Sequence, residues 1–370
     1  MKEKLMHRIA KDNKINAIWI ALGLIALLIR QIFARQPELT EQLYSRGVFL
    51  GVRVFIDYLL AWIPFPLLYL FVPAVIYLIG RQLSGWYHKS FASTTGRVVN
   101  LLGRTGAFLG GSLFFFFMLW GYNYNRVLLE QQLGLELEPL SVSELRKELY
   151  EEGAELKRLR RLIPQADTYT IEEQMLPEDL EGELRNQLES WLESHGYPTI
   201  GSVRGKLIYP KGIFLRFSSS GLYFPFTGEG HIDAALHPLQ RISVMAHELG
   251  HGYGFGHEGT CNFLAYIACS TSDDPLIAYA GRLSYWRPLA VNSRRYEPEA
   301  YREYRESLPL GIQADLDAIN ELLLRYPDIM PEFRYHAYDA YLKAQGIEEG
   351  IKNYSRVIML VRAWKESQRI

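Results

Sequence analysis

The sequence has few cysteines and almost no net charge. Its two cysteines, Cys261 and Cys269, lie eight residues apart in a stretch of helical character, which separates their Cα atoms by about 12 Å at about 1.5 Å per residue. A disulfide needs less than about 7 Å, so we expect two buried, small apolar side chains. The formal net charge of −1 provides no global field for nucleic acid, and we expect no such partner.

Internal repeats are also lacking, and the apolar residues are unevenly spread. The apolar content of 48% is near that of soluble proteins, but the long apolar runs all fall within the first 125 residues. The length of 370 residues allows two domains, or one domain with a membrane part. We therefore expect a membrane anchor over residues 1–125, a helical linker or subdomain over 126–198 and a catalytic domain over 199–370.

Three apolar stretches of the anchor are candidates to span a lipid bilayer, namely residues 15–33, 63–80 and 101–122. Each approaches the roughly 20 residues that a spanning helix needs. Between the first two, residues 48–62 mix charged and apolar side chains. This stretch is either an amphipathic interfacial helix or a lengthened start of the second span, and the sequence leaves both open.

Basic residues set the expected orientation. The segment before Ile15 has five basic residues against two acidic ones, and the loop between the second and third spans has Arg81, Lys89 and Arg97 and no acid. Both segments should be cytoplasmic under the positive-inside rule. Three spans then place everything after about Tyr122 on the periplasmic or exterior side of a bacterial inner membrane, whereas an even number of spans would reverse this.

The most informative motif is His247-Glu248-Leu-Gly-His251, which reads H-E-x-x-H. On a helix, residues four apart lie on one face, so both imidazoles can approach a single Zn²⁺ with Glu248 beside it as the general base. The motif does not lie inside a membrane span, because Arg241 precedes it and the apolar run that follows, residues 263–269, is too short.

Two adjacent residues are candidates for the third metal ligand. His257 completes H-E-x-x-H-x-x-G-x-x-H, the metzincin pattern, although no clear Met-turn follows. Glu258 instead gives two histidines and a carboxylate, the ligand set of thermolysin-like enzymes. Asn262 lies four residues after Glu258 on the same helix face, where it could orient His251 through a hydrogen bond.

The residues before the motif indicate a small sheet. Residues 206–209, 212–217 and 221–226 alternate or are rich in aromatic and β-branched side chains. Pro225 confines the last of them to a sheet edge or a strand end. Such an edge strand, with Tyr223, Phe224 and Phe226, could hold an extended substrate by strand addition, or it could be an ordinary sheet edge.

Several strings together resemble an uncharacterised bacterial membrane family, catalogued as domain of unknown function 3810. They are residues 221–229, the H-E-x-x-H, residues 262–269, 272–275, 338–343 and 350–356. The resemblance covers nearly the whole chain. It implies a multi-span membrane anchor and a gluzincin-like zinc peptidase with no established substrate.

The resemblance also bears on the third ligand. That family usually continues after H-E-x-x-H with G-F-A-R-E-x-E-A-N, whose first E falls on Glu258 and whose N falls on Asn262. Its R falls on His257, which speaks against His257 as a ligand. Its second E falls on Thr260, a departure that removes that position as a ligand here. We therefore expect His247, His251 and Glu258 to hold one zinc ion per chain.

The predicted fold is α+β, with a helical membrane anchor followed by a zincin-like, mostly helical domain with a small antiparallel or mixed sheet. The predicted function is hydrolysis of an extracytoplasmic peptide or protein through a zinc-bound water, with Glu248 as the general base. Tyr279, Arg282 and Tyr285 are candidate oxyanion stabilisers because they follow the metal helices closely. The alternative is a membrane-tethered binding or assembly protein whose zinc site is structural or lost.

Overall fold

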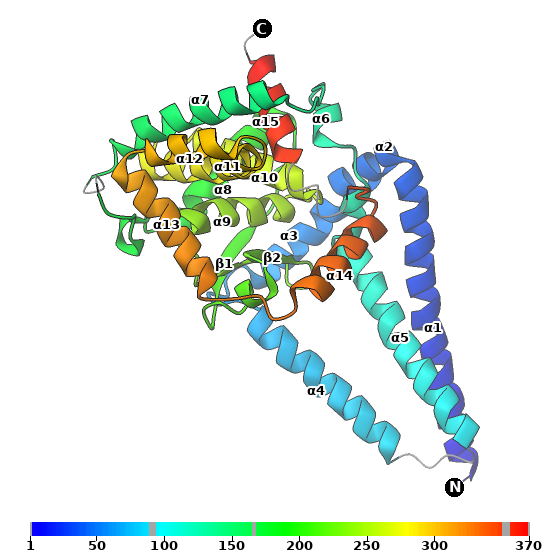
Figure 1. Ribbon diagram of the computed structural model, residues 1–370. Coiled ribbons are helices and arrows are strands. Elements are labelled where there is room, and N and C mark those ends of the chain that lie inside the picture. The colour runs from blue at the N-terminus through cyan, green and yellow to red at the C-terminus, as the bar shows by residue number, and fades with distance from the viewer. Residues whose placement is uncertain (1, 89–93, 165–167, 350–355, 369–370) are drawn as a thin grey trace. The chain divides into compact units, whose positions relative to one another are not determined.

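The structure is a computed structural model that describes residues 2–88, 94–164, 168–349 and 356–368 (Figure 1). The chain forms two compact units. The first unit comprises residues 1–126 and 225–227, and the second comprises residues 127–224 and 228–370. Lys89, one of the loop charges behind the predicted orientation, and residues 350–355 of the family string lie outside the described residues.

The first unit is helical throughout its regular structure. Its elements are α1 (Lys2–Arg35), α2 (Pro37–Leu39), the π-helix Thr40–Val48, α3 (Phe49–Leu60), α4 (Leu68–Tyr87), α5 (Thr94–Leu119) and the 3₁₀ helix Gly121–Asn125. Three stretches, Asn13–Arg35 within α1, all of α4 and all of α5, are long and apolar enough to cross a membrane. This confirms the prediction of three apolar helices near the N-terminus.

The second apolar helix starts later than the sequence indicated. It begins at Leu68 rather than residue 63, because Pro64 and Pro66 each lack a backbone N–H and disfavour helical backbone in the residue before them. The preceding helix, α3, ends at Leu60, and residues 61–67 are not helical. Residues 48–62 are therefore not a lengthened start of the second span, and their interfacial placement stays a prediction.

Helices α1 and α5 meet at two glycines. A Cβ atom on Gly110 would lie 2.4 Å from the carbonyl oxygen of Trp19, and one on Gly23 would lie 2.5 Å from the Gly110 Cα atom. Real Cβ atoms do not approach backbone this closely. Glycine at both positions therefore sets the spacing of the two helices, as small residues do where helices pack in a bilayer.

The second unit is mostly helical and contains a three-stranded mixed sheet, as predicted. Its helices are α6 (Leu129–Gln132), α7 (Val142–Arg160), α8 (Leu180–Ser194), α9 (Pro238–Gly252), α10 (Glu258–Ser270), α11 (Pro275–Tyr296), α12 (Pro298–Glu306), α13 (Leu310–Leu324), α14 (Pro331–Ala344) and α15 (Val357–Ser367), with short 3₁₀ helices at Glu173–Met175 and Leu215–Phe217. The strands lie in the order β1-β3-β2, with β1 (Arg204–Ile208) parallel and β2 (Gly221–Phe224) antiparallel to the central β3 (Glu229–Asp233).

The prediction of a strand over residues 212–217 is wrong, and β3 is the strand that the sequence did not reveal. The buried Asp233 carboxylate accepts backbone N–H groups from Gly212 at 2.7 Å, Phe214 at 2.8 Å and Leu215 at 3.1 Å. This holds the segment in a loop that ends in the 3₁₀ helix. The backbone of Gly212 has φ of 84°, which an L side chain rarely adopts.

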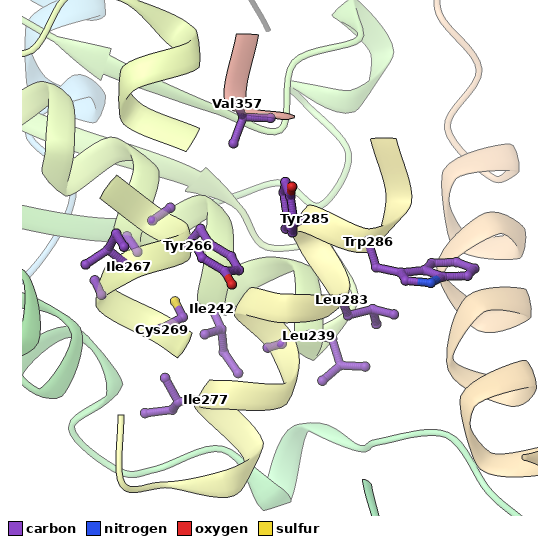
Figure 2. Close-up of a cluster of buried hydrophobic side chains, with 14 of the residues drawn as sticks. Leu239, Ile242, Tyr266, Ile267, Cys269, Ile277, Leu283, Tyr285, Trp286 and Val357 are labelled. Carbon is purple, nitrogen blue, oxygen red and sulfur yellow. The ribbon is translucent and has the colours of Figure 1, made fainter. Parts of the chain in front are cut away.

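Helices α9, α10 and α11 pack together in the core of the second unit, and α9 carries the H-E-x-x-H motif. Figure 2 shows side chains from all three, including Ile242 of α9, Ile267 of α10 and Leu283 of α11, gathered in one buried cluster. Cys261 and Cys269 lie in the same core as buried free thiols, as expected. Close packing of these helices fixes the positions of the residues on their shared faces.

Candidate metal site

Helix α9 carries the first three residues of the site. His237 caps its N-terminus and Pro238 occupies its first turn, where the missing N–H is harmless. His247 and His251 then lie one turn apart with their ring centroids separated by 4.8 Å. Both imidazoles and the Glu248 carboxylate between them are buried.

A tight turn brings the fourth residue into place. The chain leaves α9 through Gly254, whose φ of 84° favours glycine, and re-enters helix α10 at Glu258. Glu258 Oε2 lies 3.1 Å from His247 Nε2 and 3.5 Å from His251 Nε2, and the two Nε2 atoms are 3.0 Å apart. Within the described residues, these three side chains form a cluster able to hold a metal ion.

The other nitrogen of each ring fixes its tautomer. His251 Nδ1 lies 2.8 Å from the carbonyl oxygen of Phe255, and His247 Nδ1 lies 2.9 Å from the side-chain oxygen of Asn262. Because these oxygens only accept hydrogen bonds, both Nδ1 atoms donate. In the neutral rings, both Nε2 atoms then direct a lone pair at Glu258, so three acceptors converge on one point.

The spacing of these three atoms fits a zinc ion. Ligand atoms about 2.0–2.1 Å from a tetrahedral zinc lie roughly 3.3–3.4 Å from one another, close to the separations of 3.0–3.5 Å seen here. Two imidazoles and one carboxylate with hydrogen-bonded outer atoms are also the chemistry that a zinc site uses. The donor set therefore fits the predicted metal.

The pKa shifts of the charged groups in the cluster also fit a cation at this place. Burial lowers the pKa of His251, but Cys261 and Glu258 raise it, with a net shift well above the ordinary value. Burial also raises the pKa of the Cys261 thiol, so we assign the upward shift to the Glu258 carboxylate. Burial raises the pKa of Glu258 as well, yet the two imidazoles hold it well below its usual range. The buried carboxylate thus requires a proton or a metal cation beside it.

Glu248 lies against the sheet. A Cβ atom on Gly221 would be 2.5 Å from Glu248 Oε1, and one on Gly230 would be 2.6 Å from Glu248 Cβ. Glycines in β2 and β3 therefore create the space for this side chain. Burial raises the pKa of Glu248, and among the described residues its Oε2 atom has no hydrogen-bond partner. Burial that shifts the pKa of a carboxylate is frequent at functional sites and also occurs in structural networks.

The structure changes the partner expected for Asn262. The prediction paired it with His251, but its side-chain oxygen accepts from His247. The carbonyl of Phe255, in the turn after α9, already occupies His251 Nδ1. Between the two candidate third ligands, the structure brings Glu258 to the histidines, while His257 occupies the N-cap position of α10 outside the cluster.

The three candidate oxyanion stabilisers contact other carboxylates instead of the cluster. The Tyr279 hydroxyl donates to Asp315 at 2.8 Å. Arg282 donates to Glu152 at 3.1 Å and the Tyr285 hydroxyl donates to Glu148 at 3.2 Å. These residues follow the metal helices in sequence, but they face α7 and α13, so the geometry gives their assignment to the oxyanion no support.

The structure does not place the three residues of the predicted edge strand in one element. Tyr223 and Phe224 lie in β2, an edge strand of the sheet, paired with Gly230 and Glu229 of β3. Phe226 follows the strand and belongs to the first unit, within which it packs on Phe71 with ring centroids 5.4 Å apart. Their role in substrate binding stays a prediction.

Sequence reasoning also missed one side chain at the cluster. The hydroxyl of Tyr338, in α14, donates to Glu258 Oε1 at 2.8 Å. The only signal in the sequence was its place in one of the strings that carry the family resemblance. No spacing rule connects a tyrosine to a carboxylate 80 residues earlier.

Comparison with known families settles which group the chain falls in. The profile of the family described as "Protein of unknown function (DUF3810)" matches residues 44–362. The chain belongs to this family. The matched range includes Tyr338 and all three residues of the candidate metal site, His247, His251 and Glu258. No curated protein and no solved structure matches the chain.

Proposed function

We propose that this DUF3810 protein is a membrane-anchored zinc metallopeptidase of gluzincin type, with a zincin-like catalytic unit. One observation carries the proposal. Two imidazole Nε2 atoms and one carboxylate oxygen converge within 3.0–3.5 Å in a buried place, beside a buried glutamate of an H-E-x-x-H helix. Converging acceptors repel one another unless a cation lies between them, and a zinc ion satisfies all three.

The residues divide the chemistry between them. His247, His251 and Glu258 would hold the zinc ion, which would act as a Lewis acid toward a water molecule and a peptide carbonyl. Glu248 accepts a proton from the attacking water as the new C–O bond forms. It then delivers that proton to the amine nitrogen as the C–N bond breaks. Asn262 and Phe255 hold the two imidazoles in the required tautomer.

We further propose that the catalytic unit acts outside the cytoplasm of a bacterial cell, anchored in the inner membrane. The support is the basic N-terminal segment and basic loop, combined with three apolar helices before the site. The substrate would then be a periplasmic or membrane-proximal peptide or protein. Reporter fusions after residue 88 and after residue 126 test on which side of the membrane each position lies. The first fusion should report a cytoplasmic position and the second an extracytoplasmic one.

The decisive experiment measures zinc per chain by elemental mass spectrometry on full-length protein in detergent, after chelation and reloading. Wild-type protein should hold about one zinc, and Glu258→Ala should hold markedly less. His257→Ala is the matched control, because His257 is adjacent in sequence but outside the cluster, and it should keep its zinc. Zinc retained by Glu258→Ala and lost by His257→Ala would move the third ligand to His257.

Activity is tested separately with a fluorogenic peptide mixture. Glu248→Gln should keep its zinc and lose hydrolysis by about 10²–10⁴-fold, the usual contribution of a general base. Undiminished hydrolysis in this variant would contradict the mechanism. A full zinc content with no hydrolysis in the wild type would favour the binding or assembly protein with a structural zinc.

A further inference from the structure

The two oxygens of Glu258 have different partners. Oε2 faces the imidazoles of His247 and His251, whereas Oε1 accepts the hydroxyl of Tyr338 at 2.8 Å. A free carboxylate can rotate about its last bond and present either oxygen, or both, to a cation. The tyrosine removes that choice by engaging one oxygen on the far side of the carboxylate from the histidines.

Tyr338 comes from a helix that is otherwise held by few buried side chains. Within α14, only Leu342 is buried, and Phe333 and Tyr335 expose 70% and 43% of their surface. The ring of Tyr338 stacks on that of Tyr341 at 6.1 Å, which restricts the direction of its hydroxyl. The contact with Glu258 therefore joins a largely exposed helix to a buried carboxylate.

We propose that Tyr338 is a positioning residue of the zinc site, one that makes Glu258 a ligand through Oε2 alone. The inference rests on the proposed zinc site. A hydrogen bond to the outer oxygen of a ligating carboxylate orients it and adjusts its basicity, and loss of such a partner commonly weakens metal binding by about 10–100-fold. By linkage, zinc strengthens the contact of α14 with Glu258 by the same factor that the contact strengthens zinc binding.

The test compares Tyr338→Phe with Tyr335→Phe in full-length protein in detergent. Phenylalanine keeps the ring at each position and removes only the hydroxyl, and Tyr335 lies on the same helix with its ring beside His336. Zinc affinity is measured by competition with a chromophoric chelator. Tyr338→Phe should bind zinc about 10–100-fold more weakly than wild type, and Tyr335→Phe should match wild type.

A second measurement separates positioning from a general effect on folding. With Co²⁺ in place of zinc, the visible absorption spectrum reports the number and arrangement of ligands. It should change in Tyr338→Phe, because Glu258 is then free to supply both oxygens, and stay unchanged in Tyr335→Phe. A residue with a merely structural role would lower the thermal stability of the metal-free protein and leave this spectrum as it is.

Hydrogen–deuterium exchange provides a third measurement, which starts from the wild-type protein. Added zinc should slow the exchange of the α14 amides, and this protection should disappear in Tyr338→Phe. Wild-type protein that binds zinc without protecting α14, or a Tyr338→Phe variant with wild-type affinity, would overturn the positioning role alone. Wild-type protein that binds no zinc would overturn the proposed function, and the positioning role with it.

Discussion

The long helices of the two units differ in how far their apolar side chains are exposed. In the first, apolar side chains point outward, and Leu28 of α1 exposes 63% of its surface. In the second, leucines such as Leu184 and Leu188 of α8 are fully buried. Asn13–Arg35 within α1 is long and apolar enough to cross a membrane, and lipid would cover such an outward apolar face, whereas a helix in water must hide its apolar face against a neighbour.

Both units contain a buried carboxylate that is paired with an arginine. In the first, Glu41 accepts hydrogen bonds from Arg126 at 2.7 and 2.9 Å, and in the second, Asp315 accepts from Arg160 at 2.8 Å. Glu258 differs, since its cluster oxygen faces two imidazoles whose charge depends on a proton. Glu41 and Asp315 thus have a permanently charged guanidinium beside them, whereas the partners of Glu258 in the cluster carry a charge only when they are protonated.

The largest predicted effect concerns the arginine-paired carboxylates. Asp315→Ala should lower the free energy of unfolding by about 3–5 kcal/mol, because it leaves the buried Arg160 without a carboxylate to balance its charge. Denaturation followed by tryptophan fluorescence in mild detergent measures this. The control is Asp317→Ala, whose side chain is 73% exposed beside Arg305 and should cost about 0–1 kcal/mol. Equal losses in both would remove the distinction between buried and exposed pairs.

A matched pair of leucines tests the opposite burial directly. Leu188→Ala should cost about 2–5 kcal/mol, because it leaves a cavity in the core of the second unit. Leu28→Ala, on the outer surface of α1, should change the stability in detergent by less than about 0.5 kcal/mol. The same denaturation experiment serves for both. A large loss from Leu28→Ala would mean that this face of α1 packs against protein.

The third prediction concerns pH. Burial lowers the pKa of His237 from 6.5 to about 4, so the folded protein favours the neutral ring. Stability should be complete above about pH 6.5 and should fall as the pH drops toward 4, by about 3 kcal/mol in all at about 1.36 kcal/mol per pKa unit. His237→Asn keeps an N-cap side chain for α9 and should lose this component. Identical pH profiles for the two proteins would refute the assignment.

The smallest effect concerns the glycine contact of the first unit. Gly110→Ala should destabilise the packing of α1 and α5 by about 1–3 kcal/mol, because the new Cβ atom would meet backbone at 2.4 Å. Gly80→Ala, in α4, meets nothing within 4 Å and should be neutral or slightly stabilising. Thermal unfolding of the two variants in detergent compares them. A neutral Gly110→Ala would show that the helices separate easily at this point.

The features that the sequence predicted correctly depend on residues that are close together along the chain. The three apolar helices followed from length and hydropathy, and the helical face that joins His247 and His251 followed from residues four apart. The expected pairing of Asn262 with His251 failed, because a carbonyl in the turn had already taken that nitrogen.

Other errors came from contacts between distant segments. Residues 212–217 have the composition of a strand, but the Asp233 carboxylate, about 20 residues later, holds them in a loop. Tyr285 follows the metal helices in sequence, yet its hydroxyl meets Glu148 of α7. Neither outcome is encoded in a local pattern, because each depends on which face of a helix or strand another element covers.

The sequence by itself determined that this protein has three apolar helices followed by a unit with two histidines and a glutamate on one helix, since helical geometry repeats every 3.6 residues. The family resemblance favoured Glu258 as the third metal ligand beside His247 and His251. Only the tertiary structure decided that the Glu258 carboxylate meets both imidazoles and that Tyr338, 80 residues away, holds its outer oxygen. Distances between segments that are remote in sequence are set by packing of the whole core, which no local rule supplies.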